Sequence, residues 1–356
     1  MLDYSAVGAP GLEPVLAKEL RDLGLGGGPG SLRDLYRANL LLRSADRVLV
    51  RMGRFPAHAF PELRRKASRL AWKSYLKPGQ PVVFRVHSQR SRLYHESAVA
   101  ERMAGAIADS LGAPPQAGKD GQLIDVRLES DLCTISLDSS GAPLHKRGYR
   151  LATGKAPLRE SVAAGIVLAS GWDRRSPLLD PFCGSGTIPI EAALLAKNIA
   201  PGRGRRFAFM DWPVFDRGAW EAVCAQAEKE EAAAGPKIMA SDRDSGAIRA
   251  AQDNARRAGV AGCIEFSCRA VSAVEPPPGP GWVVTNPPYG VRLRQSNDIR
   301  DLYAQFGRVL RAQCPGWHVS VLSGGPRLMS GTGLSFAQGI STMNGGLPVR
   351  LASCLV

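Results

Sequence analysis

The regular alternation of strand-like and helix-like segments in the second half of the chain most constrains its fold. Five short apolar runs predict strands at residues 178–180, 238–241, 264–267, 281–285 and 317–322. Between them lie segments with the apolar spacing of helices, at residues 158–170, 188–197, 245–258 and 298–313. This order is typical of an open parallel sheet that carries helices on both faces.

The C-terminal end of the chain adds a hairpin to this pattern. Apolar runs at residues 334–342 and 347–356 are joined through Asn344-Gly345-Gly346, and Asn-Gly between such runs is a strong hairpin signal. Seven strands with a terminal hairpin favour a class I, Rossmann-like methyltransferase domain over a symmetric dinucleotide-binding fold. We therefore predict an α/β methyltransferase domain over residues 151–356.

Two smaller α+β units are predicted before this domain, over residues 1–55 and 56–150. The first combines a helix at residues 11–23 with strands at 2–7, 32–36 and 47–55. The second combines helices at 57–70 and 96–111 with strands at 81–87, 123–128 and 131–137. Nothing in either unit looks catalytic.

A glycine-containing loop, Asp-Pro-Phe-Cys-Gly-Ser-Gly-Thr, follows the first strand of the α/β domain and opens its next helix. The glycines allow a ligand to approach the backbone closely. The loop lacks the Gly-Lys-Ser/Thr of a Walker loop and the last glycine of a dinucleotide fingerprint, so a ligand without a phosphate fits better. The amino-acid end of S-adenosylmethionine is such a ligand. The predicted cofactor-binding residues are Asp180, Phe182, Gly184, Ser185, Gly186 and Thr187.

An acidic residue ends the next strand, in Ser-Asp-Arg-Asp. Asp242 is placed there to bridge the two hydroxyls of a ribose, as an acid at the end of a second strand does in dinucleotide-binding folds. Asp244 is better interpreted as the N-cap of the helix that follows. Asp242 therefore joins the predicted cofactor site.

The turn Asn286-Pro287-Pro288-Tyr289 ends the strand at residues 281–285. The prolines stiffen it and donate no backbone hydrogen bonds. The Asn286 amide oxygen and the Pro287 carbonyl could accept the hydrogens of an exocyclic amine, while the face of Tyr289 stacks on the ring that bears it. We predict Asn286, Pro287 and Tyr289 as the catalytic residues.

The net charge of +14, from 46 Lys and Arg against 32 Asp and Glu, predicts a polyanionic partner such as nucleic acid. Residues 43–77 hold ten basic side chains and only two acids. A second basic segment, residues 143–160, combines positive charge with a tyrosine. The predicted RNA-binding residues are Arg64, Arg65, Lys66, Lys146, Arg147, Tyr149 and Arg150. A solvated basic face and an ordinary linker remain alternative interpretations of the two segments.

Other features of the sequence point to the cytoplasm. No apolar run approaches the ~20 residues of a membrane span, and the N-terminus lacks the basic start and apolar core of a signal peptide. The seven cysteines have no paired spacing, and Cys263 and Cys268 do not suggest a zinc site. We expect reduced thiols, no metal and a cytoplasmic protein.

The chain resembles the THUMP-domain RNA guanine-N2 methyltransferases, which include the RlmL-type 23S rRNA enzymes and the TrmN-type tRNA enzymes. The resemblance covers nearly the whole chain. It is carried by the segments SRLYHESAVAERMAGAI, LDSSGAPLHKRGYRLATGKAPLRESVAAGIVLASGW, LLDPFCGSGTIPIEAALLA, FAFMDWPVFD, SDRD and TNPPYG.

This resemblance implies a ferredoxin-like module over residues 1–55, an RNA-gripping THUMP module over 56–150, and a single methyltransferase domain. It implies guanosine in structured RNA as the substrate, with 23S rRNA favoured over tRNA. One departure is Ala270, which stands where the family often has an acid that holds the adenine amino group of the cofactor.

Two other functions remain open at this point. DNA adenine-N6 methyltransferases also use an Asn/Asp-Pro-Pro-Tyr turn, although the N-terminal units and the segment around Lys146 argue against that substrate. A non-catalytic RNA-binding assembly factor would account for the missing acid at Ala270, although the complete Asn286–Tyr289 turn argues against it.

Overall fold

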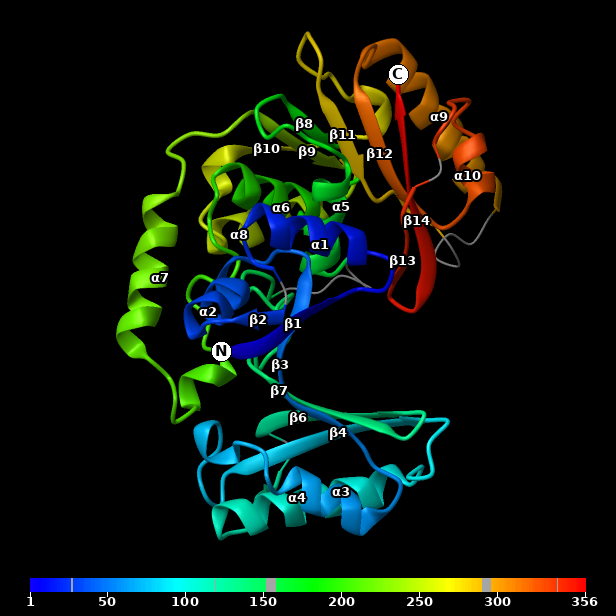
Figure 1. Cartoon of the computed structure of the whole chain (residues 1–356). Coiled ribbons are helices and arrows are strands. Elements are labelled where there is room, and N and C mark those ends of the chain that lie inside the picture. The colour runs from blue at the N-terminus through cyan, green and yellow to red at the C-terminus, as the bar shows by residue number, and fades with distance from the viewer. Residues whose placement is uncertain (27, 119, 152–157, 290–295, 338) are drawn as a thin grey trace.

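The structure is a computed structural model, and it describes residues 1–356 except 27, 119, 152–157, 290–295 and 338. Two seven-stranded sheets form its framework, one from the N-terminal half and one from the C-terminal half (Figure 1). None of the helices in the described part of the chain is long and apolar enough to cross a membrane.

The N-terminal sheet has the strand order β2-β1-β3-β7-β6-β4-β5. Its strands are β1 (Leu2–Gly8), β2 (Gly28–Gly30), β3 (Ala45–Pro56), β4 (Pro81–Gln89), β5 (Gln116–Ala117), β6 (Gln122–Glu129) and β7 (Leu132–Asp138). The accompanying helices are α1 (Glu13–Asp22), α2 (Leu32–Leu41), α3 (Phe60–Ala67) and α4 (Glu96–Leu111). The long strand β3 pairs with β1 near its start and with β7 along its second half, so it carries one sheet through both predicted modules. The module boundary predicted after residue 55 falls at the end of this shared strand.

The C-terminal sheet has the order β10-β9-β8-β11-β12-β14-β13. Its strands are β8 (Leu178–Asp180), β9 (Ile238–Asp242), β10 (Ile264–Cys268), β11 (Trp282–Thr285), β12 (His318–Ser323), β13 (Ser341–Asn344) and β14 (Leu347–Leu355). The helices are α5 (Glu160–Ala169), α6 (Thr187–Ala196), α7 (Arg217–Lys229), α8 (Ser245–Arg257), α9 (Ser296–Gln313) and α10 (Pro326–Ser330). Strands β8 to β12 are parallel and β14 runs antiparallel to β12 and β13, which confirms the predicted sheet and its terminal hairpin. The first arm of the hairpin is shorter than the predicted 334–342, because β13 begins only at Ser341.

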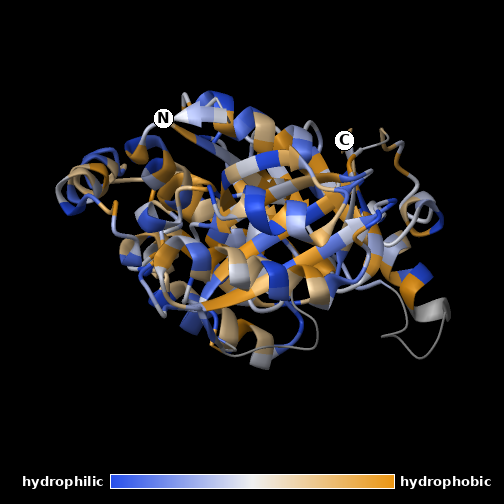
Figure 2. Cartoon of the chain, turned by 60° about the horizontal axis from the view of Figure 1, so that its bottom comes forward, coloured by the Kyte–Doolittle hydropathy of each residue, from blue (hydrophilic) through white to orange (hydrophobic). Residues whose placement is uncertain are grey.

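Both faces of the C-terminal sheet are buried, as the apolar strands predict. Successive residues point to opposite faces: Val284 joins the core under α5, α6 and α8, whereas Val283 joins the core under α9 and α10. In Figure 2 the strands in the interior are mainly orange, and the surrounding helices mix blue with orange. The period of two along each strand therefore provides two separate cores.

Residues 200–229 belong to the C-terminal half in sequence but pack on the N-terminal half in space. Phe209 is fully buried, with its ring centroid 4.7 Å from that of Tyr36 on α2 and 5.3 Å from that of Phe207. The Trp212 indole donates to the side chain of Gln122 on β6 at 2.8 Å. α7 then lies along α2, at the left edge of Figure 1. These contacts join the two halves into one body.

A second contact joins the start of the chain to the terminal hairpin. Gly11 has φ +85° and lies against the carbonyl of Ser341 in β13, so that a Cβ atom there would be 1.7 Å from that oxygen. Only glycine satisfies both the backbone conformation and the close approach. The hairpin that borders the site described below is therefore supported by the N-terminal half.

The structure corrects one predicted element in the first module. Residues 32–36 form the start of helix α2 and not a strand. Ser31 caps this helix, since its side chain accepts from the Asp34 N–H and the Asp34 carboxylate accepts from the Ser31 N–H. This capping box, together with the buried Tyr36 and Leu40 four residues apart, identifies the start of a helix, and both features were present in the sequence.

Phe209→Ala tests the contact between residues 200–229 and the N-terminal half. The substitution removes a fully buried ring from an aromatic cluster, so we expect the free energy of unfolding to fall by about 3–5 kcal/mol in urea titrations. Tyr36→Phe is the matched control, because it removes only the hydroxyl that accepts from the Asp216 N–H at 2.9 Å. A loss below about 1 kcal/mol for Phe209→Ala would show that this segment does not pack on α2 in solution.

Candidate active site

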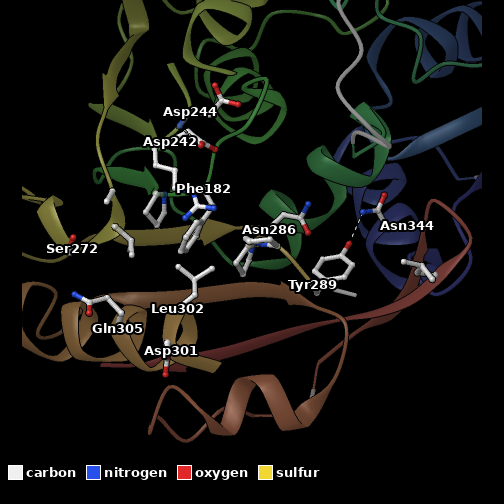
Figure 3. Close-up of a pocket in the computed structure, with 17 residues that line it drawn as sticks. Phe182, Asp242, Asp244, Ser272, Asn286, Tyr289, Asp301, Leu302, Gln305 and Asn344 are labelled. Carbon is white, nitrogen blue, oxygen red and sulfur yellow. Dashed lines mark hydrogen bonds between the residues drawn. The ribbon is translucent and has the colours of Figure 1, made fainter. Parts of the chain in front are cut away.

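The carboxyl ends of three neighbouring parallel strands, β9, β8 and β11, meet at one edge of the C-terminal sheet. A cavity of about 670 Å³ opens at this edge (Figure 3). It is lined by Pro181, Phe182, Asp242, Arg243, Asp244, Ala270, Val271, Ser272, Asn286, Pro287, Pro288, Tyr289, Asp301, Leu302, Gln305, Asn344 and Leu347. All three predicted motifs therefore contribute to one cavity.

Of the predicted cofactor-binding residues of the glycine loop, Phe182 lines the cavity, whereas Gly184, Ser185, Gly186 and Thr187 are not among its lining residues. Gly184 has φ +52°, and nothing lies within 4 Å of the position that a Cβ atom would take. Gly186 has φ +82° and packs closely on Ala251 of α8, where a Cβ would be 2.9 Å from the Ala251 Cβ. The first glycine thus leaves open space for a ligand, and the second allows helix α6 to start close to α8.

Asp242 lies at the end of β9 and holds the glycine loop. Its carboxylate accepts from the Gly184 N–H and from the Asp244 N–H, both at 3.0 Å. Each oxygen keeps a lone pair for a further donor on the cavity side. Asp244 caps α8 by accepting from the Gly246 and Ala247 N–H groups, as predicted.

The rim after β10 contains no acid. Ala270 precedes the short 3-10 helix Val271–Ala273, and the side of the cavity that the acid would occupy is lined by Ala270, Val271 and Ser272. Ser272 is the polar side chain on this rim (Figure 3). At the position where the resemblance leads us to expect an acid, the polar groups are therefore the Ser272 hydroxyl and the backbone N–H and C=O groups of this turn.

Asn286 follows β11 and supplies an unpaired acceptor to the cavity. Its amide oxygen Oδ1 is buried and has no hydrogen-bond partner within the described part of the chain. A buried polar atom without a partner costs about 1–3 kcal/mol, so such an atom in a cavity indicates a missing ligand. Pro287 and Pro288 have no N–H groups that could pair with this oxygen.

Tyr289 is held by the terminal hairpin. The Asn344 side-chain amide, at the end of β13, donates to the Tyr289 hydroxyl at 2.6 Å (Figure 3). Gly345 and Gly346 follow with φ values of +57° and +82°, which makes the tight turn into β14. The orientation of the tyrosine ring is thus fixed through its hydroxyl, which the sequence did not indicate.

Asp180 lies behind the cavity and not in its wall. It is buried, and its Oδ1 accepts from the Thr285 hydroxyl at 2.6 Å and from the Phe182 N–H at 3.1 Å. Burial raises the pKa of Asp180 to about 7, and the nearby Asp242 carboxylate acts in the same direction. Its place corrects the expectation of direct cofactor contact: Asp180 ties β8 to β11 and so positions Asn286.

Helix α9 and the hairpin add lining residues that sequence reasoning missed. Asp301, Leu302 and Gln305 point into the cavity from one face of α9, and Asn344 and Leu347 close it from the hairpin (Figure 3). The helix itself was predicted. Nothing in the sequence showed that the face with Asp301 and Gln305 borders the site. Among the described residues no group of His, Cys, Asp or Glu is placed to hold a metal.

The predicted RNA-binding residues on α3 differ in their availability. The Arg64 guanidinium makes two hydrogen bonds to Asp109 at 2.7 Å, and the Lys66 ammonium contacts Glu62 at 2.7 Å and the Pro56 carbonyl at 2.8 Å. Arg65 is exposed. All three lie on the surface, so their RNA contact stays a prediction.

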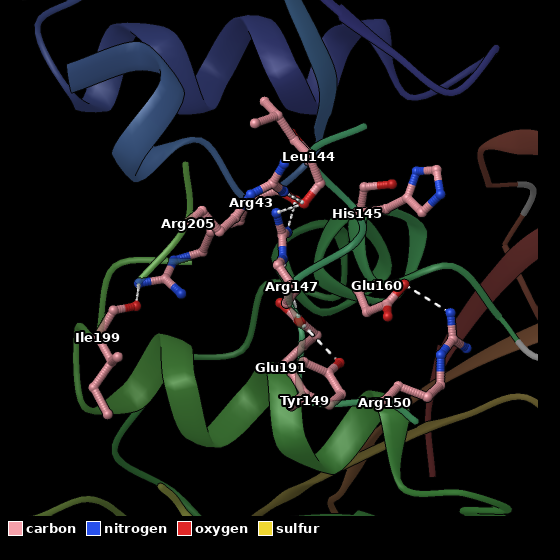
Figure 4. Close-up of polar contacts among 12 residues, drawn as sticks. Arg43, Leu144, His145, Arg147, Tyr149, Arg150, Glu160, Glu191, Ile199 and Arg205 are labelled. Carbon is pink, nitrogen blue, oxygen red and sulfur yellow. Dashed lines mark hydrogen bonds and ion pairs between the residues drawn. The ribbon is translucent and has the colours of Figure 1, made fainter. Parts of the chain in front are cut away.

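The second basic segment is largely internal, which corrects the prediction for two of its residues. Arg147 and Tyr149 are buried, and both contact the Glu191 carboxylate of α6, through Arg147 Nε at 3.5 Å and the Tyr149 hydroxyl at 3.0 Å (Figure 4). Arg150 pairs with Glu160 at 2.8 Å and is half-buried. The sequence did contain one indication of this burial. Glu191 stands inside the otherwise apolar helix α6, and a buried carboxylate requires a cationic or hydrogen-bonding partner.

This buried cluster extends to the N-terminal half. The Arg147 guanidinium donates to the backbone carbonyls of Leu144 and Arg43, and Arg43 itself donates to the Ile199 carbonyl at 2.8 Å. Burial lowers the pKa of Arg43 to about 10 and raises the pKa of Tyr149 well above its ordinary value. These side chains hold the two halves together, and of the four residues predicted to bind RNA in this segment Lys146 is the exposed one. The rest of the segment, residues 152–157, lies outside the described residues.

The pH dependence of the free energy of unfolding tests the state of Asp180. Its pKa is about 7 in the folded protein against an ordinary value of 3.8. Between these values the native state holds a proton that the unfolded chain has lost, so the contribution of Asp180 is largest at low pH and decreases as the pH rises to about 7. Relative to Asp180→Asn, the wild-type protein should lose up to about 1.4 kcal/mol per pH unit across this interval in urea titrations. Parallel pH curves for the two proteins would show that Asp180 is ionised in the fold.

Comparison with known proteins places the chain in a family. A family profile described as "RMKL-like, methyltransferase domain" matches residues 147–352. The ribosomal RNA large subunit methyltransferase K/L of Methylococcus capsulatus is 36% identical over 98% of this chain and 50% of its own length. The protein slr0064 of Synechocystis, whose name assigns it provisionally to the RNA methyltransferases, is 35% identical over 98% of this chain and 95% of its own. The chain thus spans about half of the K/L relatives and nearly all of slr0064.

Solved structures agree with this assignment. The SMU.472 protein, solved in complex with SAH, has a TM-score of 0.89 at 31% identity, covering 98% of this chain and 97% of that one. A Listeria monocytogenes protein described as a predicted N6-adenine-specific DNA methylase has a TM-score of 0.87 at 33% identity, covering 98% and 94%. TrmN from Thermus thermophilus, at 21% identity and a TM-score of 0.72 over 99% of both chains, shares the fold.

These structures confirm the predicted class I methyltransferase fold. SAH is the product that S-adenosylmethionine leaves after giving up its methyl group, so the SMU.472 complex supports the predicted cofactor. The profile match and the relatives above 30% identity along 98% of the chain lead to the same conclusion: the chain belongs to the RMKL-like methyltransferase family.

Proposed function

We propose that this chain transfers a methyl group from S-adenosylmethionine to the exocyclic N2 amine of a guanosine in structured RNA, with 23S rRNA as the favoured source. The observation that carries the proposal is the buried Oδ1 of the cavity-lining Asn286, which has no hydrogen-bond partner among the residues that the structure describes. The K/L relatives are named as methyltransferases of large-subunit ribosomal RNA, which supports the choice of RNA.

The residues around the cavity fit the cofactor. The open space at Gly184 suits its amino-acid end, the Asp242 carboxylate suits the ribose hydroxyls, and the turn at Ala270 and Ser272 suits the adenine edge. Phe182 offers an apolar surface between them. S-adenosylmethionine supplies an electrophilic methyl group when it is bound in this cavity.

The turn after β11 prepares the amine for the transfer. The lone pair of an exocyclic guanine nitrogen is delocalised into the ring, which makes the nitrogen a poor nucleophile. Hydrogen bonds from the amine to Asn286 Oδ1 and the Pro287 carbonyl would favour the pyramidal nitrogen and hold it in line with the methyl group. No strong base is needed, because the amine becomes acidic as the N–C bond forms. The target base must be unpaired or flipped out of its helix to reach the Tyr289 ring.

Analysis of the modified nucleosides separates this proposal from its alternatives. RNA and DNA substrates are incubated with the protein and methyl-labelled cofactor, then digested to nucleosides and identified by mass spectrometry. N2-methylguanosine supports the proposal, N6-methyladenine would establish the adenine enzyme, and absence of label from every substrate would favour the non-catalytic RNA-binding factor.

Asn286→Ala tests the acceptor directly. The lost carbonyl acts mainly when the amine becomes pyramidal, so we expect kcat to fall by roughly 10²–10³, by analogy with the loss of one preorganised oxyanion-hole donor. RNA and cofactor affinity should stay close to wild type, since the amine is a small part of a large electrostatic interface. Single-turnover rates and calorimetry measure the two effects.

Asp242→Ala is the complementary control for Asn286→Ala. It removes hydrogen bonds at the cofactor end of the cavity, so it should weaken cofactor affinity by about 1.5–3 kcal/mol. A single-turnover rate within a few-fold of wild type for a folded Asn286→Ala protein would remove this turn from the mechanism.

A double-mutant cycle tests the hydrogen bond between Asn344 and Tyr289. If the bond acts by orienting the ring, Tyr289→Phe and Asn344→Ala should each lower kcat/KM by roughly 2- to 13-fold, the equivalent of about 0.5–1.5 kcal/mol for one neutral hydrogen bond. The double variant should lose no more than either single variant. Losses that add fully would show that the two side chains act independently.

A further inference from the structure

An exposed aromatic ring lies at the far end of the N-terminal sheet, away from the residues already discussed. Tyr94, between β4 and α4, is 66% exposed, and its ring centroid is 4.1 Å from that of the exposed His95. No other aromatic residue in the described part of the chain belongs to the large exposed apolar side chains. A single exposed ring does not by itself require a partner, but its accessible face is free to stack on another planar group.

The segment that carries this ring, residues 89–95, is held rigidly by its neighbours. Leu93 is buried and its carbonyl accepts from the Ser88 hydroxyl at 2.8 Å. The Arg92 N–H donates to the Asp131 carboxylate at 2.7 Å, and the Ser91 hydroxyl accepts from the Asp131 N–H at 2.9 Å. The segment is therefore tied to the β6–β7 turn, and Tyr94 is presented in a fixed position.

The same segment contains a strained residue. Arg90 has φ +51°, a left-handed conformation that costs a non-glycine residue on the order of 1 kcal/mol. Its side chain is exposed and takes part in no ion pair within the described structure. Strain of this kind is found mainly where the surrounding structure forces it, often at binding sites. An arginine kept at such a position is best explained by what its side chain contacts outside the chain.

The segment carries Arg90 and Arg92. The nearby Arg127 is paired with Asp125 at 2.8 Å, and Glu96 and Glu129 are exposed acids beside the segment. Arg92 is 73% exposed, with Nε 3.7 Å from Asp131, and Arg127 is 58% exposed. His58 Nδ1 lies 3.3 Å from Oδ2 of Asp131, the same oxygen that Arg92 Nε approaches. Of the acids, Asp131 is thus neutralised by its contacts, and its carboxyl pKa is lowered, first by the Arg92 N–H and also by His58 and Arg92.

We propose that residues 89–95 form a nucleotide-binding platform, on which an unpaired RNA base stacks on Tyr94 while Arg90 and Arg92 contact the phosphates on either side. Single-stranded nucleic acid is bound in general by aromatic rings combined with cations that follow the backbone. A protein partner is less suitable, because Leu93 is buried and no contiguous apolar patch surrounds the tyrosine. The proposal rests on the proposed RNA substrate.

The position of the platform suits an RNA that also reaches the active site. In the view of Figure 1, the loop that follows β4 lies on the same side of the molecule as the β13–β14 hairpin that borders the cavity. The platform and the cavity are joined through the N-terminal sheet and the contact of Gly11 with β13. One structured RNA can therefore place a single-stranded nucleotide on the loop while its target guanosine enters the cavity.

RNA affinity of Tyr94 variants tests the platform. The full-length protein is titrated with an RNA hairpin that has an unpaired loop, and with a blunt RNA duplex of equal length. Tyr94→Ala should weaken binding of the hairpin by about 10-fold, within the range measured for loss of one base–aromatic stack, and should leave duplex binding unchanged. Tyr94→Phe should bind like wild type, because it keeps the ring. Leu355→Ala, which removes another exposed apolar side chain at 64% exposure, is the matched control.

Two arginine variants test the phosphate contacts. Arg90→Gln and Arg92→Gln should each reduce the slope of log K against log salt by about 0.7–1, the effect of one lost phosphate contact. The proposal is overturned if Tyr94→Ala binds the hairpin RNA within twofold of Leu355→Ala, or if neither arginine variant changes the salt slope. The two proposals can fail separately. If the wild-type protein makes N2-methylguanosine but Tyr94→Ala binds the hairpin normally, the platform alone is refuted. Tyr94-dependent hairpin binding without any methylated guanosine refutes the proposed reaction alone.

Discussion

The buried hydrogen bond between Thr285 and Asp180 supports the arrangement on which the site depends. It links the ends of β11 and β8 at 2.6 Å. The same Asp180 carboxyl oxygen also accepts from the Phe182 N–H at the start of the glycine loop. The loop and the Asn286 turn are therefore placed by the same carboxylate. Because the strands are parallel neighbours, this one contact sets the separation between the glycine loop and the Asn286 turn, to which we assign the cofactor and the target amine.

The halves of the molecule are joined by two different kinds of contact. Aromatic rings from residues 207–220 fill the space beside α2, where apolar burial provides the stability. Between β3 and α6 the contact is polar: Arg43, Arg147 and Glu191 lie in a buried cluster with Tyr149. A buried cluster of this kind contributes less to stability than an apolar one, but its geometry admits few alternative arrangements. The N-terminal half and the methyltransferase sheet are therefore held in a defined relation, which a bound RNA that contacts both requires.

Much of the fold could be predicted from local patterns. The five parallel strands and helices α5, α6, α8 and α9 follow from apolar runs and helical spacing, and the terminal hairpin follows from Asn344-Gly345-Gly346, whereas α7 and α10 were not predicted. That the three motifs meet at one cavity was also predicted, because the carboxyl ends of adjacent parallel strands must meet at one edge; Phe182, Asp242, Asn286, Pro287 and Tyr289 line it. The predicted strand at 32–36 was wrong, because the capping box at Ser31 and Asp34 outweighed a weak apolar run. The roles of Arg147 and Tyr149 were wrong because a basic, glycine-punctuated segment looks the same on the surface and in an interface.

The sequence by itself determined the class of domain, the order of its elements and the motifs that meet at the sheet edge, since each depends on residues close together in the chain. Only the tertiary structure decided which side chains of these motifs face the cavity. Asp180 faces inward toward Thr285, Asn344 reaches back to Tyr289 across more than fifty residues, and α9 turns Asp301 and Gln305 toward the site. These outcomes depend on strand pairing and on the packing of helices over the sheet, which bring together residues far apart in sequence. A local pattern records which face of an element is apolar, but not which partner lies opposite its polar face.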